Sequence, residues 1–398
     1  MNVLIALASS SGQLSGVQRH ALNLARCLLT REEIRSVHLV AAPWQQEFVH
    51  GAAPIGDPRL HLHAAPIGNS SLSRNRWFYT QLPKLAAQLK TDLVHLAYPV
   101  PARKHAYRCP TVVTLHDLYP YDIPENFGFP KVLFNRAVLR QCLRSVDAIA
   151  CVSASTLTRL KELDAKHSFA KASVIYNSVE APPPAPLQVS LPNWSRDLSH
   201  PFVLCVAQHR RNKNILLALR IFARLIRSGN LPQHARMLVL GNPGPETPAI
   251  HNFLTDSGLA EQVILRNGIS DTDLQWCYRN CALLLAPSVI EGFGLPVAEA
   301  LLAGCRVVCS DIPAFRELGG QHCHYVPLEP HDEEAFVKAI RAALDSPAPL
   351  PVPLPQLSAS IIGAKYLDLY RSLLPSLSIK QDPHPIPLQA AEERPHTL

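Results

Sequence analysis

The sequence predicts an α/β fold of two doubly wound domains that face a central cleft. Apolar, strand-like runs alternate with amphipathic, helix-like segments, a proline-rich stretch interrupts this alternation once, and the same alternation then restarts. Strands that alternate with helices form parallel sheets, whose ligands bind beyond the carboxyl ends of the strands. Two such sheets in tandem therefore predict a ligand-binding cleft between them.

The first domain is expected over residues 1–180. Its first strand, 2–8, is apolar throughout, as in a strand buried on both faces of a parallel sheet. This run is short and lacks the basic flank of a signal peptide. Further strands are expected at 36–41, 59–64, 92–97, 111–116, 147–152 and 172–176. Helices are expected at 17–29, 75–89, 131–144 and 154–163.

The second domain is expected over residues 201–345, after a linker at 181–200 that begins Ala-Pro-Pro-Pro-Ala-Pro. Its strands are expected at 201–206, 236–241, 262–266, 282–286 and 305–309, with helices between them. After a second proline-rich connector, apolar residues at helical spacing predict a last helix within 358–375. The tail at 380–398 is rich in proline and charge, which predicts disorder.

The distribution of charge and the number of cysteines limit which partners and which cellular compartment are expected. Residues 1–180 hold 20 Lys and Arg against 12 Asp and Glu, a charge of +8, whereas residues 181–398 hold 18 against 19, a charge of −1. The basic half suits an anionic membrane or a lipid-linked diphosphate, and nucleic acid is not expected because no nucleic-acid-binding motif accompanies it. Ten scattered cysteines favour buried thiols in a cytoplasmic protein. His322-Cys323-His324 lacks the paired spacing of a metal site, so no metal site is expected.

The most informative segment is Glu-Gly-Phe-Gly-Leu-Pro-Val-Ala-Glu-Ala at 291–300. Pro296 suits the first position of a helix that Gly304 ends, which places Glu299 on its first turns and Glu291 in the preceding loop. The two glycines leave backbone N–H groups beside the positive end of the helix, where a phosphate can bind. Each carboxylate can accept hydrogen bonds from hydroxyls at one end of a ligand. A nucleotide sugar has this arrangement, because its diphosphate lies between the hydroxyls of the ribose and those of the sugar.

This segment resembles the Glu-x7-Glu signature of the retaining GT-B glycosyltransferases of family 4, the glycosyl transferases group 1. Five further segments resemble those of the family in the same order, and the resemblance extends to about residue 375. They are a glycine-containing loop at 15–20, a His-Asp segment at 112–118, Val-Ser-Ala-Ser at 152–155, Val-Ile-Tyr-Asn-Ser-Val at 174–179 and a basic loop at 206–214.

The resemblance implies a GT-B fold of two Rossmann-like domains, with the acceptor on the N-terminal side and the donor on the C-terminal side. It implies transfer of a hexose, with retention of configuration, from a nucleotide diphosphate sugar to a glycan or lipid-linked acceptor in bacterial-type polysaccharide or glycolipid synthesis. The helix at 358–375 would cross back to the first domain. No cofactor is implied, since the nucleotide sugar is the substrate and basic side chains and helix N-termini replace a divalent metal.

The resemblance also assigns the acidic and basic residues. Glu299 would accept hydrogen bonds from the ribose, and Glu291 would contact hydroxyls of the transferred sugar. Lys213 would stabilise the charge that develops on the leaving diphosphate. Many relatives have an arginine directly before this lysine, where the present chain has Asn212, so Arg211 is preferred for the accompanying contact and Arg210 stays open.

The remaining donor-binding assignments rest on loops. Gly16 would let the backbone approach the diphosphate, and the loop Ser-Ser-Ser-Gly at 9–12 stays open as an alternative. Gly292, Phe293, Gly294 and Leu295 would form the wall of the donor site. His116 ends a strand and would bond the donor sugar near the reaction centre. The ordinary alternatives are a structural histidine at His116, a solvated lysine at Lys213 and a first-turn acid at Glu299. Asp117 is expected to cap a turn, and Asn177 to shape one.

Two features suggest peripheral contact with an anionic membrane at the inner face of the cell. Arg136, Arg140 and Arg144 recur at helical spacing, and Trp77 lies in a basic-aromatic segment at 74–79. A solvated helix face with core aromatics would explain the same residues. Two other functions stay open: a nucleotide-sugar epimerase of the same architecture and a non-catalytic nucleotide-sugar-binding protein.

Overall fold

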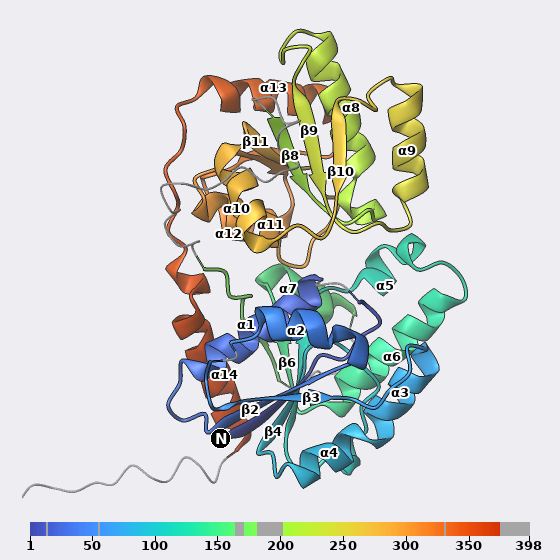
Figure 1. Ribbon diagram of the computed structural model, residues 1–398, viewed down its shortest axis with the longest axis vertical. Coiled ribbons are helices and arrows are strands. Elements are labelled where there is room, and N and C mark those ends of the chain that lie inside the picture. The colour runs from blue at the N-terminus through green and yellow to red at the C-terminus, as the bar shows by residue number, and fades with distance from the viewer. Residues whose placement is uncertain (13–14, 55, 164–170, 181–201, 330–331, 375–398) are drawn as a thin grey trace, which may run out of the picture.

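The protein is a two-sheet α/β molecule (Figure 1). The computed structural model describes residues 1–12, 15–54, 56–163, 171–180, 202–329 and 332–374. The expected linker at 181–200 and the tail at 380–398 lie outside these residues. Within the described residues, no helix combines the length and the apolar character needed to cross a membrane.

The first sheet has seven parallel strands in the order β3-β2-β1-β4-β5-β6-β7. Its elements are β1 (Asn2–Ala6), α1 (Gly16–Leu29), β2 (Ser36–Ala41), α2 (Gln46–Ala52), β3 (Leu60–Ala64), α3 (Ser71–Thr80), α4 (Leu82–Gln88), β4 (Leu93–Leu96), η2 (Lys104–Ala106), β5 (Thr111–Leu115), α5 (Tyr119–Asp122), α6 (Lys131–Ser145), β6 (Ala148–Cys151), α7 (Ala154–Leu163) and β7 (Ala172–Val174).

The second sheet has six parallel strands in the order β10-β9-β8-β11-β12-β13. Its elements are β8 (Phe202–Val206), η5 (Arg211–Lys213), α8 (Ile215–Arg227), β9 (Arg236–Leu240), α9 (Thr247–Asp256), β10 (Val263–Arg266), α10 (Asp271–Asn280), β11 (Leu283–Ala286), α11 (Leu295–Leu302), β12 (Val307–Ser310), α12 (Pro313–Gly319), β13 (His324–Val326) and α13 (Asp332–Asp345). A turn, η6 (Pro355–Leu357), then leads into α14 (Ala359–Leu373).

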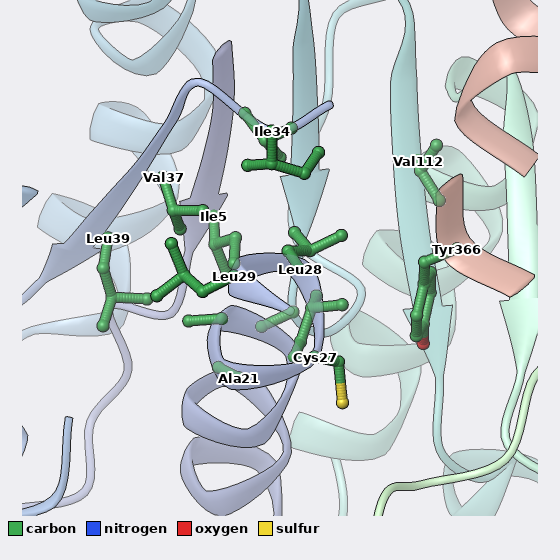
Figure 2. Packing of buried hydrophobic residues seen from close by; sticks show 14 of the residues in the cluster. Ile5, Ala21, Cys27, Leu28, Leu29, Ile34, Val37, Leu39, Val112 and Tyr366 are labelled. Atoms are coloured by element: carbon green, nitrogen blue, oxygen red, sulfur yellow. The ribbon is translucent and has the colours of Figure 1, made fainter. Parts of the chain in front are cut away.

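Both sheets are covered by helices on both faces, which explains their continuous apolar strands. Along β1, Ile5 faces the cluster built with α1, whereas Leu4 faces the cluster built with α3, α4 and α6. Figure 2 shows the first cluster, where Leu28 and Leu29 of α1 pack beside Ile5 and where Tyr366 of α14 lies near Val112. The second sheet is covered in the same way, by α8, α9 and α13 on one face and α10, α11 and α12 on the other.

The single helix expected at 75–89 is wrong, because the structure has two helices there, α3 and α4. Pro83 has no N–H to donate to the carbonyl of Tyr79, and its ring would clash with that carbonyl in a continuous helix. The first helix also begins earlier than expected, where the Ser70 hydroxyl accepts a hydrogen bond from the Ser73 N–H at 3.2 Å.

Helix α14 returns from the second domain to the first and packs against α1 (Figure 1). The approach depends on Gly363, since a Cβ at this position would lie 2.2 Å from the carbonyl oxygen of Cys27. At the other end of the helix, the hydroxyl of Tyr370 meets Nδ1 of His95 at 2.6 Å. The end of the chain is therefore part of the core of the first domain.

Candidate functional site

A cavity of about 650 Å³ lies between the carboxyl ends of the strands of the two sheets, and we call it the interdomain cavity. Loops after β1, β5 and β6 supply one wall, and loops after β8, β9, β10 and β11 supply the other. Nine of the ten predicted site residues line it: Gly16, His116, Lys213, Glu291, Gly292, Phe293, Gly294, Leu295 and Glu299.

The tenth predicted residue, Arg211, is exposed and does not line the interdomain cavity, whereas Arg210 is half-buried and does. The backbone explains the difference, because Arg210 is extended and the next three residues form the turn η5. The Arg211 N–H donates to Asn126 Oδ1 of the first domain at 3.1 Å. The structure therefore brings the neighbouring arginine to the cavity wall.

Lys213 and Glu291 form an ion pair in the cavity. The Lys213 ammonium donates to both carboxylate oxygens, at 2.6 and 2.7 Å, and the two side chains are 19% and 8% exposed. The hydroxyls of Ser288 and Tyr119 also donate to this carboxylate, at 2.8 and 3.3 Å. An ammonium group has three N–H donors, so one remains for an anionic ligand while the pair is intact.

Glu299 has different surroundings, although it is only eight residues further along the chain. It lies on α11, and its carboxylate accepts a hydrogen bond from the Tyr278 hydroxyl at 2.8 Å. Burial raises the pKa of Glu299, and the charge of Arg19 partly opposes that rise. Arg19 comes from the first domain and pairs with Asp271 of the second at 2.7 Å. The four residues therefore join the two domains at one end of the cavity.

His116 follows β5 and lines the cavity as an uncharged ring. Its Nε2–H donates to the carbonyl oxygen of Ala97 at 2.9 Å, and its ring lies edge-on to that of His20 at 4.7 Å between centroids. Burial lowers the pKa of His116 to about 4, so the imidazole is neutral at pH 7. Because Nε2 carries the proton, Nδ1 is left as an acceptor for a ligand hydroxyl.

Asp117 caps a turn, as the sequence predicts, and it also lines the cavity. Its Oδ1 accepts the Tyr119 N–H at 3.1 Å. Burial raises the pKa of Asp117 to about 6, while Arg210 and Lys213 partly oppose the shift and Glu291 adds to it. This carboxyl group therefore titrates closer to neutrality than an exposed aspartate.

The glycine segment brings the two domains into close contact. A Cβ at Gly292 would lie 1.7 Å from the carbonyl oxygen of His116, so no other residue fits there without movement. The carbonyl oxygen of Gly292 accepts hydrogen bonds from the hydroxyls of Ser153 and Thr156. Gly294, with φ of 101°, is the N-cap of α11, which begins at Leu295, one residue before the expected helix start at Pro296.

Sequence reasoning assigned no site role to Arg19 and Tyr119, which the structure brings to this cavity. Arg19 lies in the glycine-containing loop, and Tyr119 lies just beyond the His-Asp segment, so each stood beside a recognised motif. Arg210 was the alternative left open in the basic loop. The missing information in each case was the direction of the side chain. Within the described residues, no group of three or more metal-ligating side chains could hold a metal ion.

Comparison with known proteins finds two matching family models. Residues 14–181 match Glycosyltransferase Family 4, and residues 192–356 match Glycosyl transferases group 1. The two models together extend over most of the chain and meet near the predicted linker.

Curated relatives include two proteins described as mannosyltransferases. The O-antigen chain mannosyltransferase RfbU of Salmonella typhimurium is 27% identical over 232 residues, 58% of this chain and 59% of that protein. The O-antigen chain mannosyltransferase B of Escherichia coli is 24% identical over 86% of this chain and 91% of that protein. A third relative, D-inositol 3-phosphate glycosyltransferase 1 of Catenulispora acidiphila, is 30% identical over 37% of each chain. The chain thus spans about three fifths of the first of these relatives and about a third of the last.

Solved structures share the whole two-domain arrangement at low sequence identity. WaaG, a glycosyltransferase involved in lipopolysaccharide biosynthesis, superposes with a TM-score of 0.64 at 15% identity, over 96% of this chain and 100% of its own. Anabaena HepE, solved in complex with UDP and glucose, superposes with a TM-score of 0.60 at 17% identity, over 96% and 97% of the two chains. These similarities extend through both sheets and confirm the expected fold class.

Proposed function

Because this chain belongs to the GT-B glycosyltransferases, with a family 4 region followed by a group 1 region, we propose that it transfers a hexose from a nucleotide diphosphate sugar, with retention of configuration. The acceptor is a glycan or a lipid-linked sugar, and the product is a polysaccharide or glycolipid of the bacterial type. We propose mannose as the hexose because the relatives RfbU and mannosyltransferase B are described as mannosyltransferases.

One observation carries the proposal: the two signature glutamates line one cavity, together with cations from both domains. Lys213 pairs with Glu291. Arg19 pairs with Asp271 and partly opposes the rise in the pKa of Glu299. A donor that spans the cavity can place its ribose at Glu299, its diphosphate near Lys213 and its sugar at Glu291. The cavity volume of about 650 Å³ is in the range of small-molecule sites.

The proposed reaction exchanges one C–O bond for another on the same face of the sugar. The bond between the anomeric carbon and the diphosphate oxygen breaks, and a bond to the acceptor oxygen forms. The acceptor proton passes to the departing phosphate oxygen. Lys213 stabilises the negative charge that develops on the diphosphate, and Nδ1 of His116 accepts a hydrogen bond from a donor hydroxyl.

The chain's own positive groups support a reaction that needs no divalent metal and no cofactor. Lys213 and Arg210 line the interdomain cavity, and α1 begins at Gly16 on its wall, so backbone N–H groups are open to an anion there. Nothing lies within 4 Å of the position that a Cβ at Gly16 would occupy, so the backbone there is open to a ligand. These groups are a sufficient source of positive charge for a diphosphate.

The structure changes which residues support membrane contact. Trp77 is 4% exposed and belongs to the core, so the basic-aromatic segment does not offer it to a membrane. Arg136 donates to the carbonyl oxygen of Pro120 at 2.7 Å, and the Arg140 guanidinium meets the Tyr121 hydroxyl at 3.5 Å. Two of the three arginines at helical spacing therefore make contacts within the protein, although Arg140 remains exposed.

A different patch supports peripheral attachment to an anionic membrane. Phe129, Leu133 and Phe134 surround the start of α6 and are 83%, 52% and 51% exposed, with Lys131 between them. Exposed apolar side chains beside a cation suit the boundary between lipid headgroups and acyl chains. The double substitution Leu133→Ser/Phe134→Ser should reduce binding to anionic vesicles, with Leu350→Ser, at an 83% exposed position of the connector between α13 and α14, as its control.

The proposed function is tested by donor turnover without knowledge of the acceptor. The protein is incubated separately with GDP-mannose and with UDP-glucose. The release of nucleotide is followed, together with the anomeric configuration of the sugar at the moment of its release. We expect slow release of the nucleotide, and a retaining reaction should release the sugar of an α-linked donor as the α-anomer. Lys213→Ala should reduce turnover by about 10²-fold or more, because it removes charge stabilisation in the transition state.

Lys338→Ala, an exposed substitution on α13 that does not line the cavity, is the matched control. Binding of nucleotide sugar without any turnover would favour the non-catalytic alternative, and interconversion of the free donor would favour the epimerase. Full activity in a folded Lys213→Ala protein would refute the role of this lysine.

A further inference from the structure

A second cavity, of about 850 Å³, lies in the first domain and has no assigned role. It is lined where β5 and β6 begin, by the loop that follows η2, by the end of α6 and by the last turn of α14. Five residues that carry or can carry positive charge line it, and we call it the basic cavity: Lys104, His105, Arg108, Arg144 and Lys171.

The charge of the basic cavity is not neutralised by the protein. Four permanent cations face one carboxylate, Asp147, which leaves a charge of +3 with the histidine neutral. This carboxylate already accepts hydrogen bonds from the Thr111 N–H and hydroxyl, at 2.8 and 3.1 Å. Within the described residues, the side chains of the four cations make no hydrogen bond or ion pair. All four side chains are exposed, so each is open to an anion that enters the cavity.

The floor of the basic cavity is apolar. Leu143, Val146 and Leu373 contribute to it, together with the ring of Tyr107. The Tyr107 hydroxyl is buried and has no hydrogen-bond partner. Cations around an apolar floor suit a ligand that carries phosphate on an apolar or ring-shaped body, and the volume is that of a small-molecule site.

The basic cavity is separate from the interdomain cavity. Strand β5 connects the two: Thr111 at its start lies beside the basic cavity, and His116 just after its end lines the interdomain cavity. Five residues of extended strand span about 17 Å, and the two cavities share no lining residue. A diphosphate bound in one cavity therefore cannot contact the cations of the other.

We propose that the basic cavity is a second anion site, which binds a phosphate-bearing ligand through Lys104, Arg108, Arg144 and Lys171. The site does not take part in the transfer reaction, and its occupation would position the first domain relative to whatever carries the phosphate. Phosphate can reach it on a soluble molecule or on a lipid headgroup. Both sources share the chemistry of a multiply charged oxyanion held by several cations, an interaction that added salt weakens.

The test uses pyrophosphate as the probe and the full chain. Isothermal titration of the wild type should show binding at two kinds of site, because the diphosphate subsite of the interdomain cavity also takes pyrophosphate. Arg108→Glu/Lys171→Glu should remove one kind, with at least a tenfold loss of affinity, and leave donor turnover unchanged. Lys213→Ala should weaken only the other kind. Lys338→Glu, which changes charge at an exposed site outside both cavities, should remove neither.

A vesicle assay identifies the source of the phosphate. If Arg108→Glu/Lys171→Glu no longer binds phosphatidate-containing vesicles, the natural ligand of the basic cavity is a lipid headgroup. If the variant still binds the vesicles but has lost pyrophosphate binding, the natural ligand is a soluble molecule. If the double variant unfolds, Lys104→Ala/Arg108→Ala replaces it, since both side chains are exposed and unpaired within the described residues. Pyrophosphate binding that is unchanged in a folded variant would overturn the proposal. That outcome leaves the proposed transferase function intact, because donor turnover is measured separately.

Discussion

Two glutamates eight positions apart in the chain differ in environment, and this difference sets what each can do. Glu291 is ionised against an ammonium group that it holds through both oxygens. Glu299 is buried, its pKa is raised by that burial, and its hydrogen-bond partner is the neutral hydroxyl of Tyr278. The first is therefore coupled to the phosphate-binding charge, and the second is free to bind a neutral hydroxyl pair such as that of a ribose.

The two carboxylates should separate in binding experiments. Glu299→Ala should weaken binding of the free nucleoside diphosphate, because the lost contact is to the ribose. Glu291→Ala should leave that binding nearly normal and weaken binding of the complete nucleotide sugar. Titration calorimetry with both ligands measures the difference, and thermal unfolding checks that each variant is folded. An equal loss of nucleoside diphosphate affinity in the two variants would mean that their roles are divided wrongly.

Asp117 should make stability depend on pH. Its pKa is raised from 3.8 to about 6 by burial, so the folded protein holds this proton more tightly than the unfolded chain does. Stability from this group is therefore present below pH 4 and is lost as the pH rises to about 6. Asp117→Asn keeps the oxygen that accepts the Tyr119 N–H but cannot ionise.

We expect Asp117→Asn to raise the free energy of unfolding by roughly 1–3 kcal/mol at pH 7.5 and to change it little at pH 3.5. Urea unfolding at the two pH values measures this. Asp345→Asn, at an exposed position on α13, should show no such difference and serves as the control. Parallel pH profiles for Asp117→Asn and the wild type would contradict the raised pKa.

Among the elements, the loop before α11 determines how closely the two domains approach. Gly292 contacts the backbone of His116, and its own carbonyl oxygen is held by Ser153 and Thr156 of the first domain. Arg19 of α1 adds an ion pair to Asp271 of α10 beside the same cavity. These contacts bring together side chains from both sheets around one ligand space.

Gly292→Ala should hold the domains apart, because its Cβ would lie 1.7 Å from the His116 oxygen. We expect turnover to fall by about tenfold or more, as small displacements of positioned groups cost much of their effect. Small-angle scattering should show a larger radius of gyration than for the wild type. Gly51→Ala is a matched control, since nothing lies within 4 Å of a Cβ there. Wild-type turnover and dimensions in Gly292→Ala would show that the contact is not needed.

For the whole molecule, a buried chain of hydrogen bonds ties the last helix to the loop beside the cavity. The Tyr370 hydroxyl donates to His95 Nδ1 at 2.6 Å, and His95 Nε2–H donates to the Thr114 hydroxyl at 2.8 Å. Thr114 then donates to His20 Nε2 at 3.0 Å, and His20 Nδ1–H donates to Asn177 Oδ1 at 2.7 Å. Because the amide oxygen can only accept and burial lowers the pKa of both histidines, the direction is the same throughout.

Tyr370→Phe should destabilise the protein by about 1–3 kcal/mol, because it leaves a buried imidazole nitrogen without its donor. The midpoint of urea unfolding should fall accordingly. Tyr79→Phe, at a 41% exposed tyrosine whose hydroxyl has no described partner, should change it little. Equal midpoints for Tyr370→Phe and the wild type would show that the chain of hydrogen bonds adds nothing to stability.

The sequence was sufficient for most of the fold. Apolar runs predicted the strands of both sheets within a few residues, except β13, and apolar residues at helical spacing predicted α14 as a helix. These predictions succeeded because burial on both faces and helical periodicity are properties of residues that are close together in the chain. The break between α3 and α4 also has a local cause, and Pro83 indicates it in the sequence.

The sequence by itself also determined the candidate site as a set of motifs, because residues bound to one turn or helix end keep their spacing when the chain folds. Only the tertiary structure decided which side chains meet across the two sheets. It placed Arg210 rather than Arg211 in the interdomain cavity, joined Arg19 to Asp271 and buried Trp77. It also collected cations from η2, α6 and the start of β7 around a second cavity. These encounters join residues far apart in the chain, and their geometry depends on how helices and sheets pack rather than on any local pattern.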